Sequence, residues 1–245
     1  GTCGIAAGAR PVLAALTEAL QARGLTDVSI TTTGCAGLCS MEPMMSIQIP
    51  DSAPAMYGKL NADSVRRVFE QHVKPGATPV DREKIVPIPD DMPFFKKQML
   101  VVLRNKGCID PEKIEDYLAR DGYTALKTVL STLTPEEVIE QVSKASLRGR
   151  GGAGFPTGAK WRICRAEAGT PKFIIGNCDE GDPGAFMDRS LLESDPHSVV
   201  EGLAIAAYAI GAARGYVYIR TEYPLAIQRL RTAILQAGEH GLLGP

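Results

Sequence analysis

The chain has no excess of charge of either sign, since its 245 residues include 27 Lys and Arg against 28 Asp and Glu. The net charge of −1 gives no reason to expect a nucleic-acid partner. The sequence also lacks an apolar run of membrane-spanning length, because the apolar stretch 202–213 is only a dozen residues long. Its first residues show no basic and apolar secretory leader. We therefore expect a cytoplasmic protein without a transmembrane segment.

Cysteine is too scarce for a disulfide scaffold, because six unevenly spaced cysteines serve a chain of 245 residues. This usage indicates metal-binding or structural thiols in a reducing compartment. No Cys-x-x-Cys-x-x-Cys run is present in the sequence. The chain opens without Met and ends at 242–245 in a turn-like segment, and we expect a fragment truncated at both ends.

Glycine is concentrated in one segment, 149–161, whose first ten residues contain five glycines. Such a backbone can adopt left-handed angles and approach a ligand closely. Its amides can form a nest for phosphate, with Arg150 and Lys160 adding positive charge at either end. Phe155 and Trp161 offer aromatic surface for a flat ring. The segment predicts a site for a phosphate-bearing cofactor that contains a ring.

Two generic motifs do not explain this segment. Gly149, Gly151 and Gly154 match the dinucleotide fingerprint, but that motif requires a preceding strand, and residues 137–146 have a helical pattern. A Walker loop needs Ser or Thr directly after its lysine, where this chain has Trp161. A flexible hinge is the remaining alternative. The aromatic and basic residues within the segment favour a binding site over a hinge.

The whole of 149–161 resembles the flavin loop of the NADH-binding flavoprotein subunit of respiratory complex I. The same module serves in NAD(P)-linked soluble hydrogenases and formate dehydrogenases. Three short helices expected at 110–118, 123–133 and 134–146 agree with that family rather than with a β-α-β start. The resemblance implies FMN and NAD(P)H as cofactors.

An acidic loop, 177–184, follows the expected buried-type strand 172–176. Asp179, Glu180 and Asp182 by themselves favour a solvated acidic turn, and the twelve-residue calcium pattern is absent. However, a loop at the carboxyl end of a strand is where open α/β sheets place their ligand sites. The loop also resembles the second flavin loop of the same family. Its sequence is more similar to the hydrogenase and formate dehydrogenase branch of that family than to the respiratory subunits.

The resemblance implies site residues in both loops. The glycine segment would hold the FMN phosphate, and the acidic loop would hold the ribityl chain and ring. Phe155 would stack toward the nicotinamide dinucleotide with Asp182 in its pocket, whereas Ile163 stands where the family often has a second aromatic residue. No catalytic acid or base is implied. The implied cofactor-binding residues are Gly149, Arg150, Gly151, Gly152, Gly154, Phe155, Lys160, Asn177, Asp179, Glu180 and Asp182.

A third loop, 34–43, contains Cys35 and Cys39 among small residues, so it can wrap around something bound to both sulfurs. Two thiolates are half of an iron–sulfur or zinc site, and Cys3 is a candidate third ligand. A pair of buried structural thiols is an equal alternative from the residues alone. A redox disulfide is disfavoured, because the spacing is not Cys-x-x-Cys.

Residues 1–8 and 34–39 together resemble a thioredoxin-like [2Fe–2S] ferredoxin domain. That family uses four cysteine ligands, and Cys3, Cys35 and Cys39 match three of them. The resemblance places the fourth just upstream of residue 1. We expect the remaining cysteines to be buried thiols of the next domain; they are Cys108, Cys164 and Cys178.

Element patterns divide the chain into two α/β domains. Helices at 8–24 and 62–72 and strands at 28–33 and 45–49 predict a small sheet in domain 1–73, followed by a proline-rich linker, 74–93. In domain 94–245, strands at 172–176 and 216–220 alternate with helices at 196–213 and 224–237, which is typical of a parallel sheet. The expected architecture is an N-terminal thioredoxin-like domain followed by a Rossmann-like FMN-binding domain that short helices precede.

The expected function follows from electron counting. A nicotinamide transfers two electrons as hydride, an iron–sulfur cluster accepts one, and a flavin can do both. We therefore expect an NAD(P)H dehydrogenase (diaphorase) module within a hydrogenase, formate dehydrogenase or complex I-like assembly, with iron–sulfur and catalytic subunits as partners. A [4Fe–4S] cluster is expected only in the family's more C-terminal part. The alternatives are a non-catalytic electron-transfer or assembly subunit and a zinc-binding adaptor.

Overall fold

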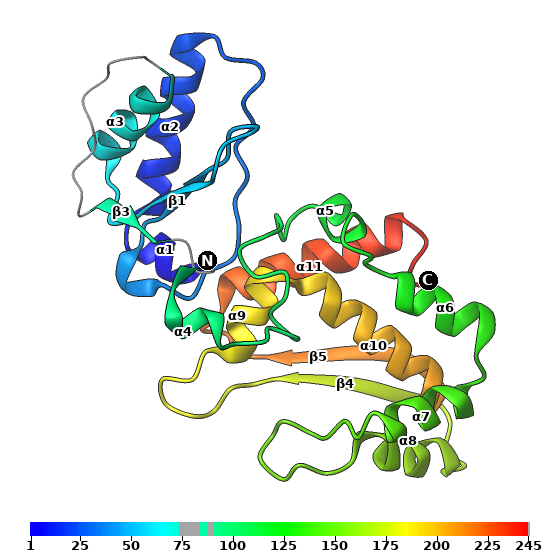
Figure 1. Ribbon diagram of the computed structural model, residues 1–245. Helices are drawn as coiled ribbons and strands as arrows, with labels where there is room; N and C mark the ends of the chain where they lie inside the picture. Colours follow the sequence, from blue (N-terminus) through cyan, green and yellow to red (C-terminus); the bar gives the residue numbers. More distant parts are fainter. Residues whose placement is uncertain (74–83, 88–90, 245) are drawn as a thin grey trace. The chain divides into compact units, whose positions relative to one another are not determined.

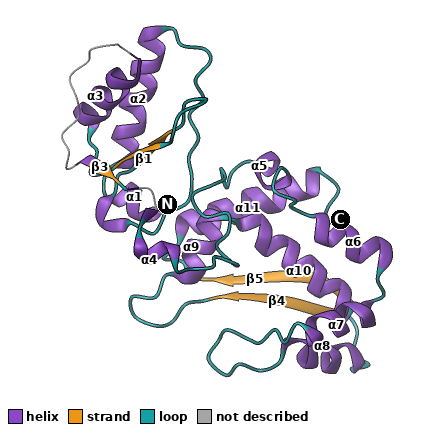
Figure 2. Ribbon diagram, in the orientation of Figure 1, coloured by secondary structure: helices purple, strands orange, loops and turns teal. Residues whose placement is uncertain are grey.

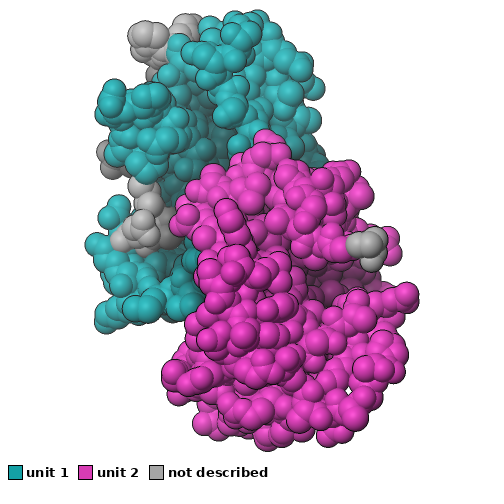
Figure 3. Space-filling model, turned by 90° about the vertical axis from the view of Figure 1, so that its right-hand side faces the viewer, with its two compact units in different colours: residues 1–108 teal, residues 109–245 magenta. Residues whose placement is uncertain are grey.

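The computed structural model describes residues 1–73, 84–87 and 91–244. The chain divides into two compact units, 1–108 and 109–245 (Figure 3). Most of the expected linker lies outside the described residues, and the expected domain limits stay predictions. Of the helices in the described ranges, none has the length and apolar character needed to cross a bilayer.

Unit 1 contains two long helices, several short ones and a small antiparallel sheet, which Figure 1 shows in blue to green. The sheet order is β1-β2-β3, with Met45 opposite Tyr57 and Tyr57 opposite Ile85. The elements are α1 (Thr2–Ala6), α2 (Ala9–Arg23), the 3₁₀ helix η1 (Cys39–Met41), β1 (Met45–Ile47), β2 (Ala55–Tyr57), α3 (Ala62–Val73), β3 (Ile85–Val86) and α4 (Pro93–Lys96).

The core of unit 1 joins α2 and α3 to the sheet through Val12, Tyr57, Val65 and Val68. The two expected helices are confirmed, and Gly24 ends α2 with a φ of 62° as a left-handed cap. The expected strand at 28–33 is wrong, since these residues form no strand in the described structure. Alternation indicates a half-buried face, but a strand also needs a neighbour for its backbone groups. In unit 1 the strand that pairs with the free edge of β2 is β3, which lies within the expected linker.

Unit 2 places helices around a parallel pair of strands, as Figure 2 shows. The short helices expected before the glycine segment are confirmed, although the first begins at Ile114 rather than at Asp110. The elements are α5 (Ile114–Leu118), α6 (Thr124–Thr132), α7 (Pro135–Lys144), α8 (Thr157–Ala166), β4 (Lys172–Cys178), α9 (Met187–Ser194), α10 (Pro196–Ile210), β5 (Ala212–Ile219) and α11 (Pro224–Glu239).

The two faces of the β4–β5 sheet differ in burial. On one face Leu203 of α10 lies against Gly176, and Val217 and Ile219 pack on the main core. On the other face Ile175 is 65% exposed and Tyr218 is 64% exposed. The expectation of a fully buried strand at 172–176 is therefore wrong for one face, because a continuous apolar run does not reveal how many faces are covered.

A buried polar network ties α10 to the start of α6. Glu201 of α10 accepts hydrogen bonds from the Tyr117 hydroxyl (2.6 Å) and from the amides of Tyr123 (2.9 Å) and Leu126 (3.0 Å). The Tyr123 hydroxyl lies 2.9 Å from Nδ1 of His197. Every polar partner here is satisfied within the protein, as buried groups require.

His197 makes the stability of unit 2 depend on pH. Burial lowers the pKa of His197, although nearby Asp195 opposes this. As pH falls, the unfolded chain binds the proton first, so this stability is present above about pH 6.5 and is lost below it. Between pH 7 and pH 5 we expect the free energy of unfolding to fall more steeply in wild type than in His197→Gln. Urea unfolding at several pH values tests this, and parallel curves would contradict it.

Candidate cofactor site

The glycine segment is a closed loop between α7 and α8. An isolated antiparallel bridge joins Arg148 to Pro156, and the Gly149 amide donates to the Phe155 carbonyl at 2.9 Å. The Arg148 Nε donates to the Gly154 carbonyl at 2.6 Å. These bonds fix both ends of the loop, which argues against the hinge alternative.

The tip of this loop is open to a ligand. A Cβ built on Gly151 or Gly152 would meet no described atom within 4 Å. Gly152 and Gly154 have φ values of 95° and 60°, which only glycine adopts without strain. Both cations predicted for this site, Arg150 and Lys160, are exposed. Bare backbone and positive charge together fit the phosphate of FMN.

The two aromatic residues predicted for this site, Phe155 and Trp161, differ in exposure and packing. Phe155 is 50% exposed at the loop and stays available to a ring. Trp161, a residue of α8, instead packs against a core cluster that includes Val138, Ile139 and Ala209. Trp161 is half-buried, so part of its side chain serves the core, and the expectation that it offers surface to a ring stays a prediction.

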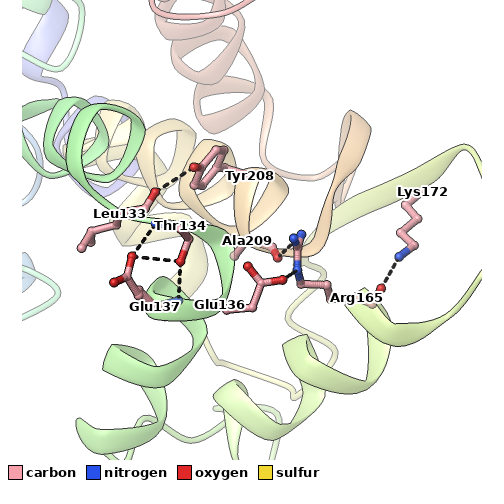
Figure 4. Close-up of polar contacts among 8 residues, drawn as sticks. All are labelled: Leu133, Thr134, Glu136, Glu137, Arg165, Lys172, Tyr208 and Ala209. Atoms are coloured by element: carbon pink, nitrogen blue, oxygen red, sulfur yellow. Dashed lines mark hydrogen bonds and ion pairs between the residues drawn. The ribbon is translucent and has the colours of Figure 1, made fainter.

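The far ends of α7 and α8 are anchored, as Figure 4 shows. Thr134 and Glu137 form a capping box at the start of α7. Arg165 of α8 donates to Glu136 of α7 at 2.5 Å and to the Ala209 carbonyl of α10 at 3.3 Å. The helices are thus held at the end away from the glycine loop.

Close packing of α7 on α8 depends on Gly158. A Cβ at this buried position would lie 2.9 Å from the amide nitrogen and 3.0 Å from the Cα of Ser143. Because backbone atoms cannot retreat cheaply, we expect Gly158→Ala to lower the free energy of unfolding by about 1–3 kcal/mol. Urea unfolding followed by Trp161 fluorescence measures this. Gly169→Ala, whose Cβ would meet no described atom within 4 Å, is the control and should show no loss.

The acidic loop follows β4 at the edge where both strands end, and Figure 1 shows the glycine loop extending toward this edge. The Asn177 Oδ1 accepts a hydrogen bond from the Asp179 amide at 3.1 Å. Asp179 and Asp182 are exposed, and positions 181 and 184 are open like 151 and 152. The acidic loop therefore leaves open space beside Asp179 and Asp182, at the edge of the sheet toward which the glycine loop extends.

Glu180 differs from the other acidic residues, because its carboxylate is engaged within the protein. It accepts hydrogen bonds from the amides of Asp188 (2.6 Å) and Arg189 (3.3 Å) at the start of α9, where a negative charge is favourable. The Tyr223 hydroxyl adds a third bond at 3.2 Å. Glu180 thus holds the acidic loop on α9, and its predicted contact with a cofactor stays a prediction.

Sequence reasoning missed Arg220, which donates to the Glu180 carbonyl and lies over the Tyr223 ring at 5.6 Å. It directly follows β5, next to the end of β4. Neighbouring parallel strands place their carboxyl ends at one edge, and this rule alone could have identified it.

The three predicted metal ligands lie together in unit 1. The Sγ atoms of Cys35 and Cys39 are 3.5 Å apart, and the Gly37 amide donates to Cys35 Sγ at 3.3 Å. Burial, followed by hydrogen bonds with Cys3 and Cys35, raises the pKa of Cys39 to about 12. Thiolates on one tetrahedral ion at about 2.3 Å would be about 3.8 Å apart, so this pair fits a metal. The described residues nevertheless contain no group of three or more His, Cys, Asp or Glu side chains placed to hold a metal ion.

The other cysteines only partly match expectation. Cys178 is buried, and burial raises its pKa to about 11. Cys164 is half-buried, whereas Cys108 is exposed and falls at the end of unit 1 rather than in the next domain. The expectation of a buried thiol is wrong for Cys108, because this residue is exposed.

Comparison with known proteins yields a family match and several relatives. Residues 142–243 match the family described as the Nuo51 FMN-binding domain. The chain is 60% identical to the NADP-reducing hydrogenase subunit HndC of Solidesulfovibrio fructosivorans over 149 residues, 61% of this chain and 30% of the relative. It is 44% identical to an NADH-quinone oxidoreductase subunit of Escherichia coli over 135 residues, 55% of this chain and 30% of the relative.

A longer match extends over both units. The NAD-reducing hydrogenase HoxS subunit alpha of Cupriavidus necator is 36% identical over 213 residues, 86% of this chain and 33% of the relative. A crystal structure of an NAD⁺-reducing [NiFe]-hydrogenase aligns with 93% of this chain and 38% of its own at a TM-score of 0.46 and 27% identity. The chain thus spans about a third of the length of these proteins.

Proposed function

We propose that the chain is part of an NAD(P)H dehydrogenase (diaphorase) module. Residues 142–243 match the Nuo51 FMN-binding domain family, and the chain is similar to NADH-quinone oxidoreductase and NAD(P)-reducing hydrogenase subunits. The observation that carries this proposal is the open glycine loop, with two glycines that face empty space between exposed Arg150 and Lys160. FMN, when bound, exchanges two electrons with a nicotinamide and passes them on singly.

The proposed residues would position and orient FMN and NAD(P)H rather than react. Loop amides at 149–154, with Arg150 and Lys160, would hold the phosphate. Asn177 and Asp179 would bind the ribityl chain and ring from the open face of the sheet, on a Rossmann-like scaffold. Exposed Phe155 would stack toward the nicotinamide dinucleotide, and Asp182 would lie in the pocket that binds this dinucleotide.

We propose for unit 1 a thioredoxin-like [2Fe–2S] domain. It is supported by the proximity of Cys3, Cys35 and Cys39 and by the relation of this unit to hydrogenase subunits. Its electrons would pass to iron–sulfur and catalytic subunits of a multi-subunit complex in the cytoplasm. A zinc adaptor remains the second candidate function, because three thiols also fit zinc.

The test is FMN binding by the purified chain. We expect saturable quenching of flavin fluorescence, and bleaching of the bound flavin by NADH or NADPH would show which one reduces it. Arg150→Gln and Lys160→Gln should each weaken FMN binding, while Arg231→Gln, an exposed cation of α11, should not. Absence of saturable FMN binding by the wild type would contradict the proposal.

The metal site has a separate test. After anaerobic reconstitution with iron and sulfide, we expect retained iron, retained sulfide and visible absorption. Cys35→Ser should lose most of the bound metal, because it removes a thiolate that is half of the closest pair. Cys164→Ser, a half-buried thiol of unit 2, is the control. Retention of zinc alone would favour the adaptor.

A further inference from the structure

A hollow of about 550 Å³ lies on unit 2 at the end of the sheet away from the acidic loop. Its walls come from α7, α8, the start of β4 and the junction of α10 with β5. Lys172 at this edge is the first residue of β4 and Cys178 is the last, so the strand separates the hollow from the acidic loop by about 20 Å. It is therefore a separate site.

Three cations line this hollow against one carboxylate. The cations are Arg162, Arg165 and Lys172, and the carboxylate is Glu136. Positive charges in one concavity favour an anion, and among the lining residues they exceed the single negative charge by two, although Glu140 on α7 also attracts Arg162. The chain as a whole carries a net charge of −1, so the excess is local.

The described contacts leave donors available on all three cations. Arg165 uses one N–H on Glu136 and one on the Ala209 carbonyl (Figure 4), out of the five that a guanidinium carries. Lys172 donates to the Arg165 carbonyl at 2.6 Å and has three N–H groups. Arg162 is exposed and reaches Ser143 Oγ at 3.4 Å.

We propose that this hollow binds a small dianion of the phosphate or phosphomonoester class. Its double charge matches the local excess, and planar guanidinium groups bind phosphate oxygens in pairs. Ile139 and Ile210 add apolar walls beside the cations, which suit the carbon part of a phosphomonoester. A bound anion would tie α7, α8 and β4 together at the ends of α7 and α8 that lie away from the glycine loop.

Inorganic phosphate is the probe for this site, and Trp161 is the reporter. It is the chain's single tryptophan and directly precedes Arg162 on α8. At constant ionic strength we expect saturable change of its fluorescence with phosphate, and saturable broadening of the ³¹P signal. Arg162→Gln and Lys172→Gln should each raise the dissociation constant about tenfold, as loss of one charge-assisted contact predicts. Arg165 is left intact, because it anchors α8.

Two further variants make the result decisive. Lys127→Gln removes an exposed cation of α6 outside the hollow and should bind phosphate as wild type does. Arg150→Gln should also keep phosphate binding, even though it weakens FMN binding. If Arg150→Gln abolishes phosphate binding while Arg162→Gln does not, the anion sits at the glycine loop and this inference is wrong, although the proposed function stands. Absence of any saturable response also overturns it.

Discussion

Replacement of Gly151 with valine is expected to abolish FMN binding while the chain stays folded. The position is exposed, lacks a left-handed φ, and its Cβ would meet no described atom within 4 Å, so a side chain can be attached there without a clash at its first atom. In the proposed site, the same space is where the FMN phosphate would approach the loop amides. Loss of two amide–phosphate hydrogen bonds, worth about 1.5 kcal/mol or more each, predicts at least about 100-fold weaker binding.

The control for this variant is Gly202→Ala, which also adds a Cβ in open space, but on the exposed side of α10. It should leave FMN affinity unchanged and slightly stabilise the helix, because alanine is the better helix former. Titrations of FMN fluorescence and thermal melts of both variants separate binding from folding. Wild-type affinity in Gly151→Val would show that the phosphate does not sit on this loop.

The glycine loop could be predicted from sequence because its signal is local. Five glycines in ten residues, with Arg150 and Lys160 nearby, describe a bare and positively charged backbone whatever the surrounding fold is. Its helical flanks were equally predictable, since Thr134 and Glu137 indicate the start of α7 within four residues. Periodicity and capping chemistry need no knowledge of distant partners.

What sequence could not give depends on contacts between distant residues. The pattern at 28–33 suits a strand, yet pairing was decided by which segment completes the sheet. Trp161 could serve a ligand or a core, and only the packing of α8 on α7 and α10 distinguishes them. The sequence did not reveal that the Glu180 carboxylate also accepts hydrogen bonds from amides at the start of α9. The cations that line the hollow of unit 2 could not be predicted as a group, because Arg162 belongs to α8 and Lys172 to β4, and only the fold brings them together.

The largest stability effect is expected from Glu201→Leu. The wild-type carboxylate is 7% exposed and receives three donors: the Tyr117 hydroxyl and the amides of Tyr123 and Leu126. Leucine fills a similar volume but accepts no hydrogen bond, so all three donors lose this acceptor. At about 1–3 kcal/mol for each lost contact, the free energy of unfolding should fall by about 3–9 kcal/mol. This is a large fraction of the stability of a typical domain.

Glu201→Gln distinguishes hydrogen bonding from volume at the same site. Its amide oxygen still accepts from the Tyr117 hydroxyl or from one amide, while its NH₂ group faces a donor, so the loss should be roughly half that of leucine. Urea unfolding followed by Trp161 fluorescence measures both, since Trp161 lies in the same unit. Glu140→Leu, at an exposed glutamate of α7, should leave the transition unchanged. Equal losses in Glu201→Leu and Glu201→Gln would mean that the negative charge, rather than the number of acceptors, holds α6 against α10.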